Sequence, residues 1–277
     1  MELRDILVLF RAGHDERAVF AVAGDLASEY RAFLRALYLE PAPVPAVADG
    51  FAMDPDAISA MADRLDAEAR RSAHDARTAF TSALETCGAN GGFTILPVSC
   101  ALAEAPIQAR MADLVVAARP HDDDPGFAKL VDHILAESGA PCLLVPETAQ
   151  SGMRFRRILI AWNGTRQARR AVDEAMPLLR EAELIEAVVI GDPPGVPSPD
   201  DDYALSIHLA RHGIATEVSH IPADGEIGDV LLDKAQSFGA DLLVMGAYGH
   251  GRTRKILSGR VSRTIFRNAS LPVLISC

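Results

Sequence analysis

Residues 241–276 read DLLVMGAYGHGRTRKILSGRVSRTIFRNASLPVLIS, and this stretch decides the fold. Leu242 to Met245 form a short, continuous apolar run, as expected of a strand that is covered on both faces. Three glycines follow, and apolar residues then recur at helical spacing as far as Phe266. A second apolar run begins after Pro272. The order strand, glycine-rich loop, helix, strand is that of one unit of a parallel α/β sheet.

The loop and helix of this stretch are basic in a chain that is acidic. Between Gly246 and Asn268 there are six basic residues and no acidic one, whereas the whole chain has a formal net charge of -11. The six are Arg252, Arg254, Lys255, Arg260, Arg263 and Arg267. Glycines let the backbone approach a ligand, and the free N–H groups of a helix N-terminus attract an anion. The pattern favours a phosphate or another anion here; the alternative is a solvated basic helix face beside an ordinary turn.

The spacing of the glycines narrows this interpretation. Gly246, Gly249 and Gly259 stand as G-x2-G-x9-G between two apolar strands, which resembles the nucleotide loop of the universal stress protein family. The resemblance implies a doubly wound α/β fold of the adenine-nucleotide α-hydrolase type, with ATP or AMP as the ligand. In that family a Ser or Thr follows the third glycine, whereas this chain has Arg260 there and Ser262 two residues later. A long cation at this position either binds the phosphate or blocks the site, and both alternatives stay open.

The whole chain repeats one plan twice. The apolar run 6–10 parallels 158–162, and each is followed by a polar turn, a helical segment and a second strand. Later in each half, 112–116 matches 240–244, and 139–145 matches 270–275. Alternating apolar runs and helical segments predict α/β domains with doubly wound parallel sheets. We therefore predict two tandem domains, 1–147 and 154–277, joined by a small polar linker.

The last strands of the two halves are the expected contact between the domains. In the family that the chain resembles, the last strands of paired domains commonly associate. The resemblance therefore implies an internal pseudo-dimer in which Leu143–Val145 lies beside Val273–Ile275. A further homodimer is left open.

The segment after Asp54 is expected to be an unusually long helix. Asp54 suits the cap and Pro55 the first turn, and Ile58, Met61 and Leu65 lie on one apolar stripe. Its many charged residues are expected to face outward, and the sequence assigns it no chemistry.

The first half lacks the features of a phosphate loop. Asp113 to Pro141 spans 28 positions (141 − 113), whereas Asp241 to Pro272 spans 31 (272 − 241), and the shortening falls where the second half has its glycines. Three consecutive acids, 122–124, place negative charge where a phosphate needs positive charge. We predict that the first domain is degenerate. The acids could alternatively hold Mg²⁺ or Ca²⁺, although consecutive side chains converge on one point with difficulty.

In the second half, the loop after the first strand joins the candidate site. Carboxyl-edge loops of neighbouring strands meet in a doubly wound sheet, where ligands bind. Asn163 stands where the family usually has Asp, Thr165 supplies a small hydroxyl, and Ile190 resembles the position whose backbone meets adenine. Trp162 is read as core packing, with contact to a base as the alternative. The candidate nucleotide-binding residues are Asn163, Gly164, Thr165, Ile190, Gly246, Gly249, His250, Gly259, Arg260, Val261 and Ser262.

Composition excludes several other classes of protein. The 277 residues, 49% of them hydrophobic, can build a substantial core. A pI near 5.2 argues against general nucleic-acid binding. The apolar runs are too short to span a bilayer, the start of the chain does not resemble a signal peptide, and the four cysteines show no paired spacing. The expected compartment is the cytoplasm, without a membrane partner.

Three functions are compatible with these features. The first is a stress-response protein that binds ATP or AMP in its second domain, with Mg²⁺ left open. The second is a nucleotide-free interaction module in which Arg260 fills the pocket. The third is a slow ATPase or phosphotransferase, which is disfavoured because Asp224 and Glu226 have no partner base or nucleophile. His208 and His212 have zinc-like spacing but no evident third ligand.

Overall fold

The computed structural model describes residues 2–11, 14, 16–41, 55–121, 123–191, 199–247 and 259–277, without the side chains of 55, 57, 58 and 199–203. The first half contains β1 (Asp5–Arg11), α1 (Arg17–Tyr30), β2 (Phe33–Glu40), α2 (Pro55–Cys87), β3 (Gly91–Pro97), α3 (Val98–Ala109), β4 (Leu114–Ala118), α4 (Pro125–Glu137) and β5 (Cys142–Val145). The second half contains β6 (Arg157–Ala161), α5 (Arg166–Glu181), β7 (Leu184–Ile190), α6 (Pro199–Arg211), β8 (Glu217–Ile221), α7 (Ile227–Phe238), β9 (Leu242–Gly246), α8 (Arg260–Asn268) and β10 (Val273–Ser276).

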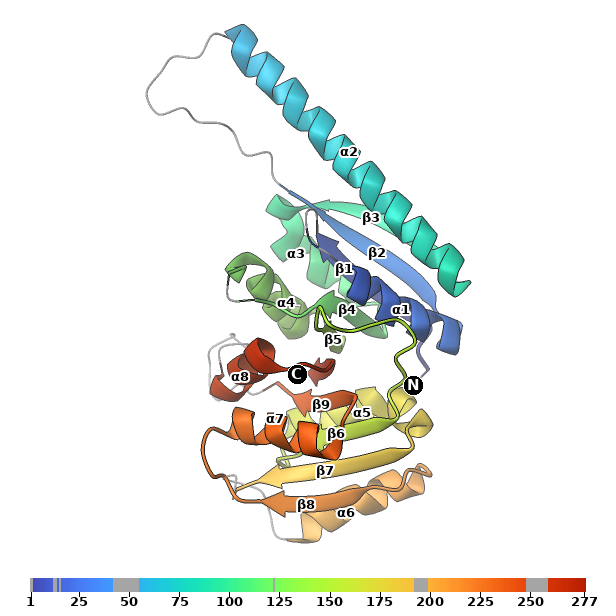
Figure 1. Cartoon of the computed structure of the whole chain (residues 1–277), viewed down its shortest axis with the longest axis vertical. Helices are drawn as coiled ribbons and strands as arrows, with labels where there is room; N and C mark the ends of the chain where they lie inside the picture. The colour runs from blue at the N-terminus through green and yellow to red at the C-terminus, as the bar shows by residue number, and fades with distance from the viewer. Residues whose placement is uncertain are drawn as a thin grey trace.

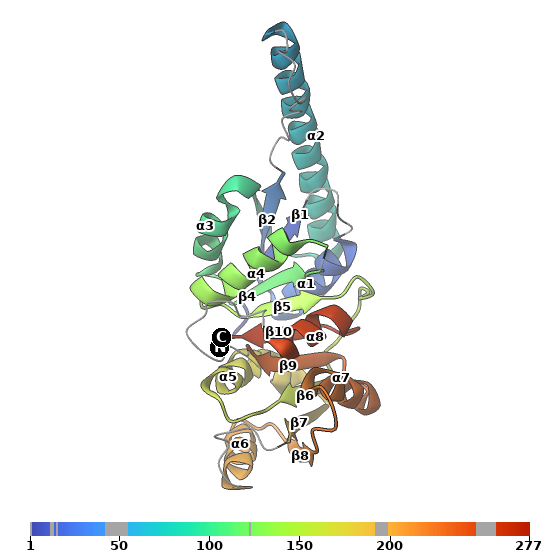
Figure 2. The same cartoon turned by 90° about the vertical axis from the view of Figure 1, so that its left-hand side faces the viewer.

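All ten strands form one sheet with the order β3-β2-β1-β4-β5-β10-β9-β6-β7-β8. Within each half every pair of neighbouring strands is parallel, and helices cover both faces (Figures 1 and 2). The second half repeats the strand order of the first in reverse. The predicted fold class, two doubly wound parallel halves in tandem, is confirmed.

Each half contains the same kind of supporting contact at the amino edge of its strands. The carboxylate of Asp113 accepts hydrogen bonds from the backbone N–H groups of Arg4 and Asp5, at 2.8 and 2.9 Å. Asp241 does the same for the backbone N–H groups of Arg156 and Arg157. Burial raises the pKa of Asp241, and these hydrogen bonds oppose that rise. The two acids, matched in the sequence repeat, therefore hold equivalent strands in place.

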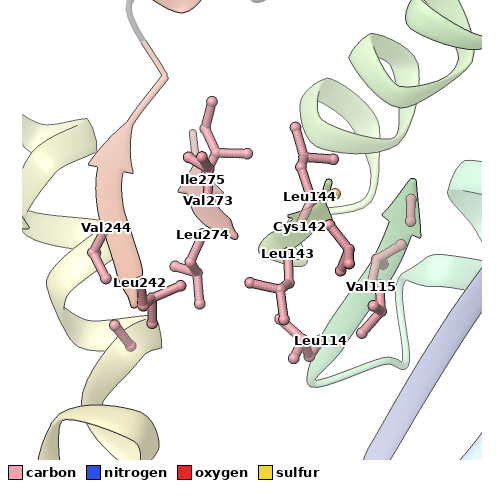
Figure 3. Close-up of a cluster of buried hydrophobic side chains, with 14 of the residues drawn as sticks. Leu114, Val115, Cys142, Leu143, Leu144, Leu242, Val244, Val273, Leu274 and Ile275 are labelled. Carbon is pink, nitrogen blue, oxygen red and sulfur yellow. The ribbon is translucent and has the colours of Figure 1, made fainter. Parts of the chain in front are cut away.

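The only antiparallel pair in the described sheet is the joint between the halves. Val273 is opposite Leu144, Leu274 opposite Leu143, and Ile275 opposite Cys142. The side chains of these residues are buried and meet across the joint (Figure 3). The predicted contact between the last strands is confirmed, and the paired residues of β5 are Cys142 to Leu144, so that Cys142 takes part in the ladder and Val145 does not.

Side chains outside the sheet also connect the halves. The Arg119 guanidinium, just after β4, donates to the backbone oxygens of Phe266 and Arg267 at the end of α8, at 2.8 and 2.5 Å. Arg170 of α5 donates in the other direction, to the oxygen of Gly139 after α4, at 2.5 Å. Each cation thus binds carbonyl groups at or just beyond a helix C-terminus, where positive charge is favourable.

Helix α2 is the feature that departs most from a compact α/β layer. It is 33 residues long, as the pattern after Asp54 predicts. Its C-terminal half packs on α1, β2 and β3, and Phe80 is buried there. Its N-terminal half projects away from the sheet (Figures 1 and 2). No described helix is long and apolar enough to cross a membrane.

Candidate functional site

The candidate site lies where the strand order of the second half reverses. Strand β6 pairs with β9 on one side and with β7 on the other. Helix α5 follows β6, and α8 follows β9, so the N-termini of both helices lie at the carboxyl edge of neighbouring strands. Such a switch point is the usual ligand position in open α/β sheets, and two helix N-termini favour an anion there.

The turn before α5 is held by its own side chains. The Thr165 hydroxyl donates to Asn163 Oδ1 at 2.7 Å and accepts from the backbone N–H of Ala168 at 3.2 Å, which caps the helix. The backbone N–H of Thr165 also points to Asn163 Oδ1, at 3.3 Å. Gly164 has a φ of 66°, in the left-handed region that favours glycine. The three predicted residues therefore form one rigid turn at the edge.

Gly246 has a packing role that does not involve a ligand. A Cβ added there would lie 2.5 Å from the backbone nitrogen of Ala168 and 2.6 Å from the backbone carbon of Gln167. The end of β9 therefore lies directly against the first turn of α5. A side chain at this position would separate the two elements that form the edge.

Helix α8 supplies the second N-terminus. Gly259 precedes it with φ −62° and ψ 142°, angles that any residue can adopt. Glycine would therefore be needed here only if a ligand or another part of the chain lay close to this backbone. Val261 is half-buried and packs against the core. Ser262 is fully buried, and its hydroxyl has no hydrogen-bond partner among the residues that the structure describes. Buried hydroxyl groups are normally hydrogen-bonded, so Ser262 is the unusual polar group of this helix.

Arg260 turns away from the core and pairs with another helix. Its guanidinium contacts the carboxylate of Glu226, the residue at the N-cap of α7. The Arg260 side chain is 82% exposed and the Glu226 side chain 48%. An exposed pair of this kind contributes little to stability, so Arg260 can change partner at small cost.

The remaining candidates are distributed around the same edge or fall outside the described residues. Ile190 ends β7 and is half-buried, so its backbone lies at the carboxyl edge beside β6. Trp162 is 8% exposed, as the packing interpretation predicts. Gly249 and His250 lie outside the residues that the structure describes.

The corresponding edge of the first half contains an ion cluster that the sequence analysis missed. Arg11, at the end of β1, donates to Asp124 at 2.5 Å and to Glu16 at 3.1 Å. Its guanidinium also lies 3.8 Å from the ring centre of Phe127. Asp124 additionally caps α4 by accepting from the N–H of Phe127. Two features of the sequence could have indicated this cluster. Arg11 directly follows the apolar run 6–10, and the loop that corresponds to the glycine-rich loop of the second half is acidic.

Other polar clusters give no catalytic or metal arrangement in the described part of the chain. His208 and His212 have ring centres 4.8 Å apart, but burial and nearby Arg169 lower the pKa of His208. Across the described ranges, no group of three His, Cys, Asp or Glu side chains is placed to hold a metal ion. Asp224 is exposed, and Glu226 is engaged by Arg260.

Comparisons with known proteins agree with this geometry. A sequence model described as the universal stress protein family matches residues 154–276. The universal stress protein Slr1230 of Synechocystis is 24% identical over 149 residues, which cover 52% of this chain and 49% of that protein. The match thus spans about half the length of this curated relative.

Solved structures extend the likeness to nearly the whole chain. A universal stress protein from Archaeoglobus fulgidus superposes with a TM-score of 0.72 at 15% identity, covering 98% of this chain and 95% of its own. A putative universal stress protein from Pseudomonas aeruginosa gives a TM-score of 0.58 at 16% identity, covering 99% and 93%. At such low identity these likenesses establish the fold of both halves and nothing finer.

Proposed function

Because residues 154–276 match the model of the universal stress protein family, we propose that the second half of the chain is a member of this family and binds an adenine nucleotide, ATP or AMP. Membership supports a role in the stress response. The proposed site is the carboxyl edge between β6 and β9, where the N-termini of α5 and α8 lie. The observation that carries the proposal is the fully buried Ser262 hydroxyl in the first turn of α8, unpaired among the described residues.

The residues of this edge fit a phosphorylated ligand. The free N–H groups of α8 and the Ser262 hydroxyl would donate to phosphate oxygens. The Asn163–Thr165 turn would form the opposite wall, and the backbone at Ile190 would meet the base. Arg260 would leave Glu226 and add a charge-assisted contact to phosphate. Mg²⁺ would arrive with the triphosphate, because the turn offers the Asn163 amide where a metal would prefer a carboxylate.

The first half is proposed not to bind nucleotide. At its equivalent edge Arg11 is already paired with Asp124 and Glu16, and its side chain is only 13% exposed. An incoming phosphate would have to displace two carboxylates and would then lie beside them, which is electrostatically unfavourable. One site per chain is therefore expected.

Titration calorimetry with ATP and AMP tests the proposal. We expect a stoichiometry of one per chain, and Ser262→Ala should weaken binding by roughly 10- to 100-fold, the value of a hydrogen bond to a charged group. Thr216→Ala is the matched control, since Thr216 also carries a buried hydroxyl without a described partner but lies beside β8. Gly259→Val should abolish binding while the circular dichroism spectrum is retained.

Each contrary result has a definite meaning. Two equivalent sites would refute the assignment of the first half as non-binding. Absence of heat with either nucleotide at millimolar concentration would favour the alternative, a nucleotide-free module that acts through protein partners. Binding that survives Gly259→Val would show that the start of α8 does not contact phosphate.

A further inference from the structure

The side-chain oxygen of Asn163 is already occupied by the turn in which it lies. It accepts hydrogen bonds from the Thr165 hydroxyl at 2.7 Å and from the Thr165 backbone N–H at 3.3 Å. A backbone N–H can only donate, so this contact identifies the accepting atom as the oxygen and not the amide nitrogen. A carbonyl oxygen has two lone pairs, and both are used here. Asn163 therefore has its NH₂ group left for a ligand, and that group donates.

Thr165 is committed in a similar way. Its hydroxyl proton is directed at Asn163, and its oxygen accepts from the backbone N–H of Ala168 at 3.2 Å. The side chains of the turn thus keep a single acceptor for a ligand, one lone pair of a neutral hydroxyl. Mg²⁺ in nucleotide sites is usually held through one or two carboxylates together with the phosphates. The side chains of this turn do not fit that requirement.

The start of α8 also offers donors to a ligand. The N–H groups of its first turn have no acceptor within the helix, and the buried Ser262 hydroxyl has no partner among the described residues. Neither the turn 163–165 nor α8 contains an acidic residue, and the first turn of α8 contains Arg260 and Arg263. The carboxylate that contacts Arg260 is that of Glu226. Both sides of the proposed site therefore present donors, and the helix adds positive charge.

Mg²⁺ and these donors compete for the same phosphate oxygens. In nucleotide complexes the metal bridges oxygens of the terminal phosphates and neutralises part of their charge. An oxygen held by Mg²⁺ is a weaker acceptor for the Asn163 amide and the Ser262 hydroxyl, because hydrogen bonds to a fully charged acceptor are the stronger ones. A second cation close to Arg260 is also repelled. Mg²⁺ that arrives with the triphosphate would thus weaken contacts and gain no carboxylate from the turn or from α8.

We propose that the carboxyl edge between β6 and β9 selects the metal-free form of an adenine nucleotide, so that Mg²⁺ weakens the binding of ATP. This selection rests on the nucleotide site proposed above and adds to it the ionic form of the ligand. AMP has a single phosphate group, which binds Mg²⁺ weakly, so AMP is bound almost equally well with and without the metal. The concentration of free Mg²⁺ then decides the occupant, since AMP gains over ATP when the metal is plentiful.

Titration calorimetry of the wild type with ATP and with AMP, in EDTA and in excess Mg²⁺ at matched ionic strength, tests this selection. Mg²⁺ should weaken ATP binding by roughly 10-fold or more, the value of one hydrogen bond to a charged group, and should leave AMP binding nearly unchanged. ATP that binds as tightly or more tightly with Mg²⁺ would overturn the inference while the nucleotide site itself would stand. Absence of heat with both nucleotides in both buffers would refute the site and the inference together.

Asn163→Asp should reverse the sign of the Mg²⁺ effect. An aspartate oxygen can accept the same two hydrogen bonds from Thr165, so the circular dichroism spectrum should be retained, but the NH₂ donor is lost. In EDTA this variant should bind ATP roughly 10-fold more weakly than the wild type, because a donor is replaced by a like charge, and Mg²⁺ should then tighten its binding.

Asn268→Asp is the matched control for this substitution. It makes the same change of charge at the exposed C-terminal end of α8, and it should respond to Mg²⁺ as the wild type does. An Asn163→Asp protein whose ATP affinity still falls with Mg²⁺ would overturn the assignment of the metal preference to this turn.

Glu226→Gln tests the remaining carboxylate. If Arg260 leaves Glu226 for phosphate, that carboxylate is released close to the start of α8. The variant should keep the preference for metal-free ATP, because the donors at the edge are unchanged. A wild type that binds ATP more tightly with Mg²⁺, together with a Glu226→Gln protein that does not, would show that the released carboxylate holds the metal and would overturn the inference.

Discussion

Gly246→Ala tests why a glycine is needed at the end of β9. The new Cβ would lie 2.5 Å from the backbone nitrogen of Ala168, whereas ordinary contact begins at 3.4 Å, a shortfall of 0.9 Å (3.4 − 2.5). The obstructing atoms belong to the backbone of α5's first turn, so rotation of a side chain cannot relieve the overlap. Either β9 or the start of α5 has to move.

The cost of that movement can be estimated from overpacked cores. Extra atoms in a well-packed interior typically destabilise a protein by about 1–3 kcal/mol. A shift of α5 would also strain the Thr165 cap, which contributes about 1 kcal/mol. We therefore expect the free energy of unfolding to fall by about 2–4 kcal/mol, corresponding to a melting temperature lower by about 2–4 °C for each kcal/mol.

The measurement is thermal unfolding without nucleotide, so that lost packing is separated from lost binding. Gly126→Ala is the matched control: its Cβ would lie 3.5 Å from the Asp124 carboxylate, an ordinary contact, in the first turn of α4. That control should be neutral or slightly stabilising. A Gly246→Ala protein that melts with the control would refute the close approach of β9 and α5. If it also failed to bind nucleotide, the glycine would be required by the ligand alone.

Three further outcomes are expected. Arg260→Ser should leave the melting temperature nearly unchanged, because the ion pair that it removes is exposed. It should weaken ATP affinity, measured by calorimetry, by roughly 10- to 100-fold if the guanidinium moves to phosphate. A gain in ATP affinity would show that the Arg260 side chain obstructs the site. Arg119→Ala should lower the free energy of unfolding, measured in urea, by about 1.5–3 kcal/mol, because two backbone carbonyls of α8 lose a charged donor. An unchanged urea midpoint of unfolding would refute this connection between the halves. In a thiol-reagent assay at pH 8, exposed Cys100 should react first, whereas Cys142 is buried and the pKa of Cys277 is raised to about 12 by burial; equal rates in the native protein would contradict this order.

The sequence predicts well those features that depend on local patterns. The runs 143–145 and 273–275 are short and continuously apolar, a pattern that predicts a strand covered on both faces. Each does form a buried strand at the joint. The stripe that includes Met61 and Leu65 predicts α2, because residues spaced three and four apart share a helix face. Only the structure shows that, among the described residues, side chains of this helix become buried from Ala73 onward.

Contacts between distant residues could not be predicted in this way. Arg260 and Glu226 are 34 positions apart and meet because α7 packs against α8. Arg11 and Asp124 are 113 positions apart and meet because β1 and β4 are neighbours. Gly246 can be recognised as a glycine at a strand end, but only the structure places the backbone of α5 against it. The sequence therefore locates the candidate edge, whereas side-chain partners depend on how the elements pack.

The joint between β5 and β10 lies within a single polypeptide, which affects how the two halves can diverge. Separate chains held by one pair of edge strands come apart on dilution, whereas a short linker gives each strand an effective concentration in roughly the millimolar range for its neighbour. Changes at Arg11 or Asp124 leave that joint untouched, because neither residue belongs to the β5–β10 ladder. Substitutions at the carboxyl edge of the first half can thus be tolerated while its last strand still covers β10.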